Sequence, residues 1–293
     1  MKLIESKAEL LLQPVGLEGV YKQIELCGRT CYKSEDKITE DSAKGFVDRM
    51  IKSNHTAMLE HGTVYLQIPG NMLKYLLTHP VEDYDKNPYS KYKEIFTGFP
   101  VSTCEIYVTT NLRVLVDNGW LDDLKYICEP TEYHAKRYTM KFITDRGVSH
   151  ELVRHRVFSF AQESTRYCNY SKDKFGNELT FIKPSWKYTK TLVSKEGLPY
   201  NGVPQFDGDY FEDFLAQSEK IYFTLLDQGW TPQQARQILP NALKTEICMT
   251  GFEDDWKHFF DLRYKETTGK AHPDMKLLAT KAKESFLSIG LDL

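Results

Sequence analysis

The side chains best suited to binding an anion gather in one stretch, residues 154–167, with the sequence RHRVFSFAQESTRY. It begins with Arg-His-Arg, and a third arginine, Arg166, follows near its end. A guanidinium matches phosphate because two parallel N–H groups meet two oxygens. Glu151 and Glu163 are the acidic residues near it in sequence, so these arginines have few carboxylates to pair with. We interpret the stretch as a binding site for a nucleotide or a ligand with several phosphates, rather than a charged helix end followed by a polar loop.

Familiar phosphate and metal motifs are absent from the sequence. It contains neither G-x-G-x-x-G nor G-x-x-x-x-G-K-[ST], so a bound nucleotide must be held by side chains. His150 and His155 resemble a zinc-protease motif, but their spacing of five places them about 140° apart around a helix. We therefore predict no metal site.

The spacing of apolar residues predicts the elements that must position this stretch. Helices are expected at 36–53, 112–127, 147–154, 209–229, 231–236, 252–262 and from 272 onward. Strands are expected at 63–68, 104–109, 137–145, 179–182 and 243–249. Strands and helices do not alternate strictly, which favours an α+β fold with a mixed or antiparallel sheet packed against helices. The arginine stretch is expected as a loop after the short 147–154 helix.

Composition limits the class of protein. The chain has 293 residues, 41% of them hydrophobic, enough for a real core, and we expect one domain over residues 1–293. A net charge of −3 argues against non-specific nucleic-acid binding. No long apolar run or secretory leader is present, which predicts a cytoplasmic protein without membrane contact. The six scattered cysteines are expected to be free, largely buried thiols.

The arginine stretch also resembles the signature of the flavin-dependent thymidylate synthases (the ThyX family). The shared pattern is Arg-His-Arg, seven further residues, Ser164, and Arg-Tyr close behind. Residues 55–61 (HTAMLEH), 235–240 (ARQILP) and 262–263 (LR) extend the match in the family's order. The resemblance implies a ThyX-like fold.

Two segments, 78–103 and 188–208, have no counterpart in shorter members of that family. Breakers such as Pro80, Pro88 and Pro100 mark the first of them, which we interpret as a long surface excursion. We expect both segments to be surface insertions.

The resemblance implies reductive methylation of dUMP to dTMP. Methylenetetrahydrofolate would donate the carbon, NADPH-reduced FAD would supply the hydride, and tetrahydrofolate would be released. Members of the family are homotetramers with sites at subunit interfaces, so the partners expected are dUMP, folate, NADPH and further copies of this chain. Two alternatives stay open: a flavin- and folate-dependent hydroxymethylase of pyrimidine nucleotides, and a non-catalytic nucleotide-binding protein.

The family's cofactor residues match particular positions in this chain. The residues implied to contact FAD are His55, Glu60, Arg154, His155, Arg156, Gln162 and His258. Phe252, Asp254 and His258 stand where the family has Asn, Arg and Asn, and Ala57 replaces a hydroxyl residue.

The family's substrate residues also match. Those implied to contact dUMP are Glu151, Arg154, Gln162, Glu163, Ser164, Thr165, Arg166, Arg236 and Arg263. Arg263 and Ser164 are the catalytic candidates: Arg263 would stabilise the pyrimidine ionised at N3, and Ser164 would donate a hydrogen bond rather than act as a nucleophile. The Pro-Cys-His tripeptide of conventional thymidylate synthases is absent. Glu151 stands where the family has Gln, and Ala161 and Gln162 replace Asn and Glu.

Plainer interpretations exist for several of these residues. Arg236 could pair with a nearby acid on a helix surface. His55 and His61 could be partly buried histidines with internal hydrogen bonds. Arg263 lies among aromatic residues, where a charge needs a partner or a ligand.

Overall fold

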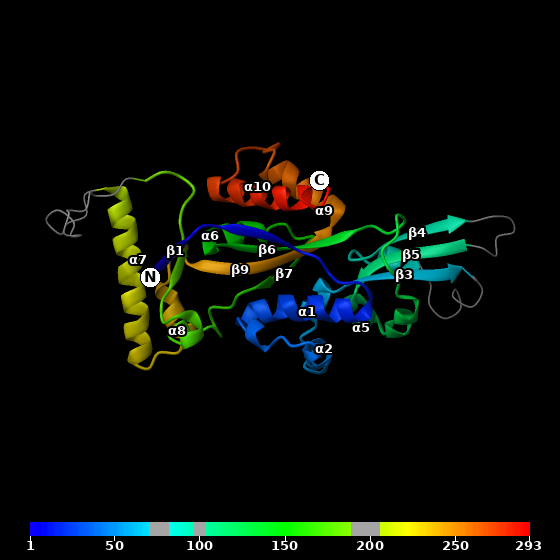
Figure 1. The fold of residues 1–293 in the computed structure, drawn as a ribbon, viewed down its shortest axis with the longest axis horizontal. Coiled ribbons are helices and arrows are strands. Elements are labelled where there is room, and N and C mark those ends of the chain that lie inside the picture. The colour runs from blue at the N-terminus through cyan, green and yellow to red at the C-terminus, as the bar shows by residue number, and fades with distance from the viewer. Residues whose placement is uncertain (71–81, 97–103, 189–205) are drawn as a thin grey trace.

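A four-stranded antiparallel sheet forms the centre of the molecule in the computed structural model, which describes residues 1–70, 82–96, 104–188 and 206–293 (Figure 1). Its strands, in spatial order, are β2 (Lys7–Leu11), β6 (Arg137–Asp145), β9 (Lys244–Phe252) and β7 (Ser159–Gln162). The longest pairing runs from Arg137 opposite Phe252 to Asp145 opposite Lys244. This sheet separates two layers of helices.

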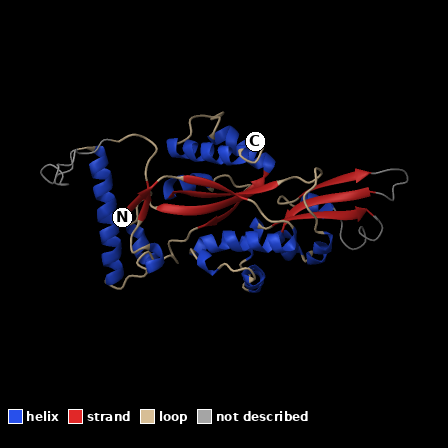
Figure 2. Cartoon of the chain, in the orientation of Figure 1, coloured by secondary structure: helices blue, strands red, loops and turns tan. Residues whose placement is uncertain are grey.

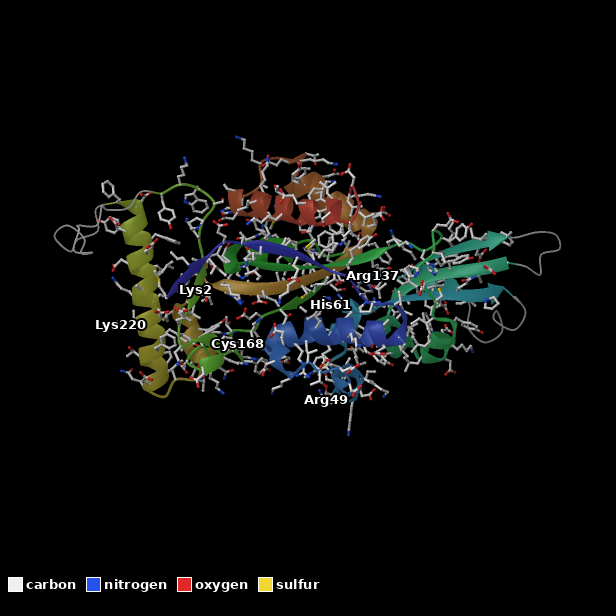
Figure 3. The ribbon with its side chains drawn as sticks, in the orientation of Figure 1. Lys2, Arg49, His61, Arg137, Cys168 and Lys220 are labelled. Carbon is white, nitrogen blue, oxygen red and sulfur yellow. The ribbon has the colours of Figure 1, made fainter. Side chains whose placement is uncertain are left out.

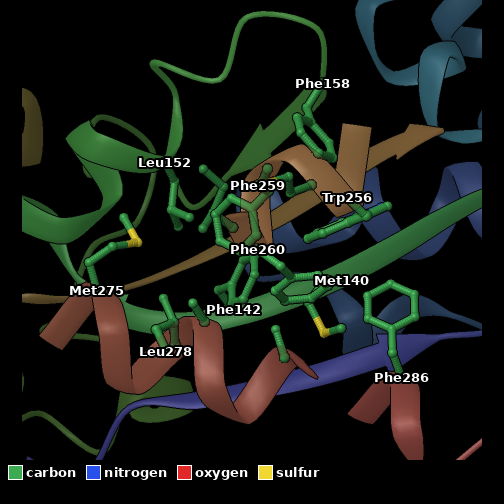
Figure 4. Packing of buried hydrophobic residues seen from close by; sticks show 14 of the residues in the cluster. Met140, Phe142, Leu152, Phe158, Trp256, Phe259, Phe260, Met275, Leu278 and Phe286 are labelled. Carbon is green, nitrogen blue, oxygen red and sulfur yellow. The ribbon is translucent and has the colours of Figure 1, made fainter. Parts of the chain in front are cut away.

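One face of the sheet carries an aromatic core. α9 (Glu253–Arg263) and α10 (Pro273–Leu287) cover this face, and Trp256, Phe259 and Phe286 are fully buried there (Figure 4). On α10 the apolar residues recur at helical spacing, so one side of the helix packs against the strands. α6 (Arg146–Leu152) adds Leu152 to the same cluster.

The other face is covered by α1 (Gly16–Tyr32), with α2 (Ser42–Lys52) beyond it (Figure 1). The sequence did not predict α1 or the strands β1 (Lys2–Ile4) and β2, and the helix expected at 36–53 is shorter. Short helices lie on either side of α2: η1 (Glu35–Lys37) before it and η2 (Thr56–His61) after it.

A second sheet extends the molecule at one end (Figure 2). It consists of β3 (Thr63–Gly70), β5 (Cys104–Asn111) and β4 (Lys91–Phe96), all antiparallel. α5 (Leu112–Asn118) and η4 (Leu121–Tyr126) follow β5. Residues 82–96, within the expected surface insertion 78–103, form α4 (Glu82–Lys86) and β4. β4 is an edge strand without a buried residue, whereas Tyr84 on α4 is fully buried. The remainder of that segment lies outside the described residues.

The opposite end holds the long helix α7 (Asp207–Asp227) and a parallel pair of short strands, β1 and β8 (Thr180–Ile182). η5 (Asp173–Phe175) precedes β8, and α8 (Pro232–Ala235) and η7 (Arg236–Ile238) follow α7. Two apolar side chains of α7, Phe214 and Ile221, are 57% and 48% exposed. The 188–208 segment lies outside the described residues except at its two ends.

The α+β prediction is confirmed, and the strand expected at 137–145 has the predicted bounds. The cysteines are free thiols, four of them buried and two half-buried, as predicted. No helix among the described residues is long and apolar enough to cross a membrane.

Candidate functional site

Arg154 and Arg156 lie in the turn between α6 and β7, and both side chains are exposed. The turn bulges outward because its two ends are anchored: Leu152 is fully buried and Phe158 is 5% exposed. Neither arginine side chain has a hydrogen bond or ion pair with any residue that the structure describes. Their charges therefore face solvent and are available to an anion.

His155, between these arginines, turns inward. Arg263 Nε donates a hydrogen bond to His155 Nε2 over 3.1 Å, and Arg263 Nη1 donates to Glu151 Oε2 over 3.2 Å. Burial, and then the positive charges of Arg263 and His258, lower the pKa of His155 to about 4. The imidazole is therefore neutral at pH 7, with an acceptor nitrogen facing Arg263.

Arg263 lies among aromatic residues, where its charge needs a partner. It has two, His155 and Glu151. α9 ends at Arg263, and Phe259 and Phe260 on the same helix are fully buried, which fixes where the guanidinium emerges. The arrangement places a half-buried positive charge beside the Arg154–Arg156 turn. Such a charge can stabilise negative charge on a ligand that reaches it.

The side chains of Gln162 and Glu163 form hydrogen bonds with other residues of the protein. Gln162 is the last residue of β7, which the sequence did not predict, and its Nε2 donates to Ser149 Oγ and Thr245 Oγ1. Glu163 is only 2% exposed and accepts hydrogen bonds from Lys244 Nζ at 2.9 Å and Tyr170 Oη at 3.0 Å. Both side chains hold the start of the following loop in place.

The loop after β7 brings Thr165 to Arg236 and fixes Ser164 against α1. Ser164 donates its backbone N–H to the carbonyl of Cys31 at 2.9 Å, and its Oγ accepts from the backbone N–H of Arg166 at 3.3 Å. Arg236 Nη1 donates to Thr165 Oγ1 at 3.4 Å, although 71 residues separate them. Arg236 begins η7 directly after α8, which has a capping box at Thr231. Arg236 forms no ion pair with an acidic residue among those that the structure describes.

Arg166 stacks on its neighbour Tyr167. Its guanidinium carbon lies 4.3 Å from the centre of the Tyr167 ring, and its Nη2 donates to the hydroxyl of the same tyrosine. The Tyr167 ring in turn contacts the Tyr32 ring, with centroids 5.2 Å apart. Arg166 and Tyr167 are both exposed, so this cation lies on an aromatic platform at the surface.

The remaining predicted residues lie further from the loop. His55 is exposed at the start of η2, and Glu60 forms an ion pair with Arg113 of α5. His258 is exposed on α9, near enough to His155 to lower its pKa. No hydrogen bond or ion pair in the described part of the chain links His55 or Glu60 to the Arg154–Arg156 turn.

A charged network beneath the loop was missed by the sequence reasoning. Glu246 on β9 binds Lys33, Lys141 and Lys244 at 2.9, 2.7 and 2.5 Å, and Lys244 also binds Glu163. These lysines keep the pKa of Glu246 well below its usual range despite burial. The alternation of Lys244 and Glu246 on one strand face was the available signal, but their partners are far away in sequence.

The fold and the site define an α+β protein with an arginine-rich binding surface. The arginines lie on the turn before β7 and on the loop after it, and they have few acidic partners. Comparison with known sequences agrees with the resemblance carried by that stretch. The family model described as "Thymidylate synthase complementing protein" matches residues 131–289, more than half of the chain. The chain belongs to this family, whose members include flavin-dependent thymidylate synthases.

Individual relatives match over part of their length. A protein named "Probable flavin-dependent thymidylate synthase" from Paramecium bursaria Chlorella virus 1 is 29% identical over 51% of this chain and 65% of its own. The flavin-dependent thymidylate synthase of Pyrococcus furiosus is 33% identical over 41% of this chain and 43% of its own. The matched region thus spans about half the length of these relatives. A UMP/dUMP methylase, PolB from Streptomyces cacaoi, covers 98% of this chain and 93% of its own at 16% identity, with a TM-score of 0.42.

Proposed function

We propose that this chain is a flavin-dependent thymidylate synthase that converts dUMP to dTMP, with methylenetetrahydrofolate as carbon donor. NADPH would reduce bound FAD, which supplies the hydride chemistry, and the folate would leave as tetrahydrofolate. Family membership supports this proposal. The observation that carries it is the exposed Arg154–Arg156 turn, whose free guanidiniums flank a neutral histidine that is held by Arg263.

The donor set of this turn fits FAD. Two exposed guanidiniums without acidic partners match the charge of its two phosphates. We assign Arg154 and Arg156 to these phosphates, with His155 beside them. His55, Glu60 and His258 are the further candidates for FAD contact, and of these His258 lies nearest the turn through its effect on His155.

We assign the loop after β7 to dUMP. Arg166 and Arg236 would bind the phosphate, because both are exposed cations at the two sides of the loop. Arg166 would leave the Tyr167 ring to do so. Ser164 and Thr165 would donate hydrogen bonds, and the internal partners of Gln162 and Glu163 suit these two residues to positioning the loop.

Arg263 would act on the pyrimidine. A positive charge near the ring stabilises the electron density that the ring acquires, so no covalent nucleophile is needed. Glu151 holds this guanidinium through an ion pair at 3.2 Å, and His155 accepts from its Nε. Ser164 would serve as a hydrogen-bond donor, since no base among the described residues contacts its hydroxyl.

We further propose a homotetramer with sites completed by neighbouring copies, and a cytoplasmic location. Three exposed apolar side chains surround the arginines: Val153, Val157 and Tyr167 are 39%, 58% and 53% exposed. Such side chains are suited to being covered by another subunit. Sedimentation equilibrium of the purified protein tests the assembly, and a monomer at micromolar concentration would contradict it.

The activity is tested by anaerobic incubation of the purified protein with FAD, NADPH, dUMP and methylenetetrahydrofolate. We expect dTMP by mass spectrometry and tetrahydrofolate by chromatography. Dihydrofolate formed in step with dTMP, or dTMP formed without a reductant, would contradict the flavin mechanism. A product heavier than dTMP by one oxygen atom would indicate the hydroxymethylase, and dUMP binding without any product would indicate a non-catalytic protein.

A further inference from the structure

A cavity of about 290 Å³ lies where residues 11–16 lead into α1, and no residue of the Arg154–Arg156 turn lines it. Its wall is formed by residues 11–16 and Val20 on one side and by Thr63, Tyr65, Arg137 and Thr139 on the other. Figure 3 labels Arg137 near His61, where β6 meets the start of β3. The proposed reaction does not use this cavity.

Arg137 is the unusual member of this wall. It is 7% exposed, yet no carboxylate among the described residues lies within ion-pair distance of its guanidinium. Nη1 donates to Thr63 Oγ1 at 3.3 Å and Nη2 to the Glu60 carbonyl at 3.2 Å, while Nε has no partner in the part of the chain that the structure describes. Its guanidinium carbon lies 5.4 Å from the centre of the Phe252 ring, and the charges of Glu60 and Asp255 act on it from beyond ion-pair distance. Three of its five N–H groups have no hydrogen-bond partner among the described residues. A buried charge in this condition is costly unless an anion pairs with it.

The Arg137 side chain lies on the cavity side of the sheet. Side chains two residues apart on a strand share a face, so Arg137 and Thr139 project to the same side of β6. The Thr139 hydroxyl forms a hydrogen bond with the Thr250 hydroxyl, which also forms one with His61 on the α1 side. Burial lowers the pKa of Arg137 to about 10, which still leaves the guanidinium charged at pH 7.

Two further features favour an anion at this place. α1 begins against the cavity, and its N-cap residue, Val15, provides no side-chain hydrogen bond to the first turn. The free N–H groups of a helix start attract negative charge. Lys136 also contributes to the wall, although its Nζ already donates to the Thr131 carbonyl.

The cavity is preformed rather than a gap between loose segments. Gln13 Nε2 donates to the Thr63 carbonyl and Gln13 Oε1 accepts from the Thr63 N–H, both at 2.8 Å. These two bonds fix residues 11–16 to β3. Gly19 lets the same segment pack closely on α1, since a Cβ at that position would lie 1.9 Å from the Pro14 carbonyl oxygen.

We propose that this cavity binds a small organic carboxylate, with its charge paired to Arg137 and its apolar body against residues 11–16 and Val20. Leu11, Leu12, Pro14, Val15 and Ile127 make much of the wall apolar. Such a wall suits an organic body better than a strongly hydrated inorganic phosphate. A volume of about 290 Å³ limits the ligand to a small molecule.

The test is calorimetric titration of the full-length protein with benzoate as the probe. We expect saturable binding of one benzoate per chain, and binding of the neutral isostere benzamide that is about tenfold or more weaker, as for loss of a charge-assisted hydrogen bond. Arg137→Met and Leu12→Trp should each abolish binding, the first by removing the charge and the second by filling the entrance. Arg49→Met, which removes an exposed arginine on α2, is the matched control and should bind as the parent does.

Several results would overturn the proposal. They are a failure of benzoate to saturate, equal affinity for benzamide, unchanged binding by Arg137→Met, and tighter binding of inorganic phosphate. Loss of benzoate binding in Arg154→Ala/Arg156→Ala would place the probe at the arginine turn and would also contradict the assignment. If Arg137→Met does not fold, benzoate binding by Leu12→Trp decides whether the cavity is the site. Leu12 is 61% exposed, so its replacement leaves the core intact.

Discussion

Arg263 Nε donates a hydrogen bond to His155 Nε2 across 3.1 Å, and this bond joins the end of α9 to the centre of the arginine turn. Because Nε2 accepts, the proton of the neutral imidazole resides on Nδ1. Glu151 binds the same guanidinium from α6. The three residues therefore form one electrostatic unit, in which a change at Arg263 must alter the protonation of His155.

Arg263→Gln should raise the pKa of His155 from about 4, without restoring the ordinary value of about 6.5. Burial is the largest cause of the lowered pKa and persists in the variant, whereas the repulsion from Arg263 is removed. Titration of the imidazole nitrogens by NMR measures this change. His258→Gln is the matched control and should give a smaller rise in the pKa of His155. An unchanged pKa of His155 in Arg263→Gln would contradict the electrostatic coupling of the two residues.

The same shift predicts how stability depends on pH. The folded-state pKa of His155 is lower than the unfolded value, so the unfolded chain binds more protons between about pH 4 and 6.5. The contribution of the neutral His155 to the free energy of unfolding is complete above pH 6.5 and is lost as the pH falls toward 4. Urea midpoints of Arg263→Gln should therefore fall less between pH 7 and 5 than those of the parent, and a steeper fall would contradict the sign.

Arg166→Ala should weaken dUMP binding by about tenfold to a hundredfold and leave FAD binding nearly unchanged, because a phosphate contact is charge-assisted. Separate calorimetric titrations with the two ligands measure this difference. Arg49→Ala removes an exposed arginine from α2 and should alter neither affinity. Equal losses for both ligands in Arg166→Ala would count against the assignment of the loop to dUMP.

Ser164→Ala should retain measurable turnover, since the role proposed for its hydroxyl is to donate a hydrogen bond. Loss of one neutral hydrogen bond lowers the rate or affinity by about tenfold, whereas loss of an obligatory nucleophile abolishes the reaction. Steady-state formation of dTMP measures the effect. Complete inactivity with intact dUMP affinity would require Ser164 to act as the nucleophile.

Glu246→Gln should destabilise the protein by about 3 kcal/mol, because it leaves three half-buried lysines without their shared carboxylate. The pKa of Glu246 is lowered, so its contribution is present above the ordinary glutamate pKa and is lost in acid. Urea unfolding at pH 7 measures the free energy of unfolding. Glu253→Gln, at a more exposed pair with Lys257, should cost less than about 1 kcal/mol. Equal losses in the two variants would rule out a special role for the network.

Local patterns predicted the elements whose signal lies within a few residues. Alternation identified β6 with its observed bounds, and the spacing of apolar residues identified the helix from 272 onward, which is α10. A capping box at Thr231 begins α8, within the helix predicted at 231–236. These features follow from backbone geometry and from side chains three or four residues apart, so they can be recognised without knowledge of the fold.

α1 escaped prediction because its buried face is partly charged. Arg29 and Glu25 are buried together and paired at 2.8 Å, which interrupts the apolar spacing that marks a helix. The helix and strand within residues 82–96 were not predicted for a related reason. The polar composition of this segment suggested a loop, but β4 pairs with β5 and Tyr84 is buried against distant residues, which compensates for weak local preference.

The sequence by itself determined which residues could bind an anion, since their types and spacing are properties of the chain, and it determined the family through their order. Only the tertiary structure decided their partners. It joined Arg263 to His155, turned Glu163 inward to Lys244, and left Arg154 exposed. It also left Arg137 buried beside a cavity, with no carboxylate of the described residues within ion-pair distance. The physical reason is that periodicity acts over a few residues, whereas these contacts join positions many residues apart, and packing of the completed fold brings them together.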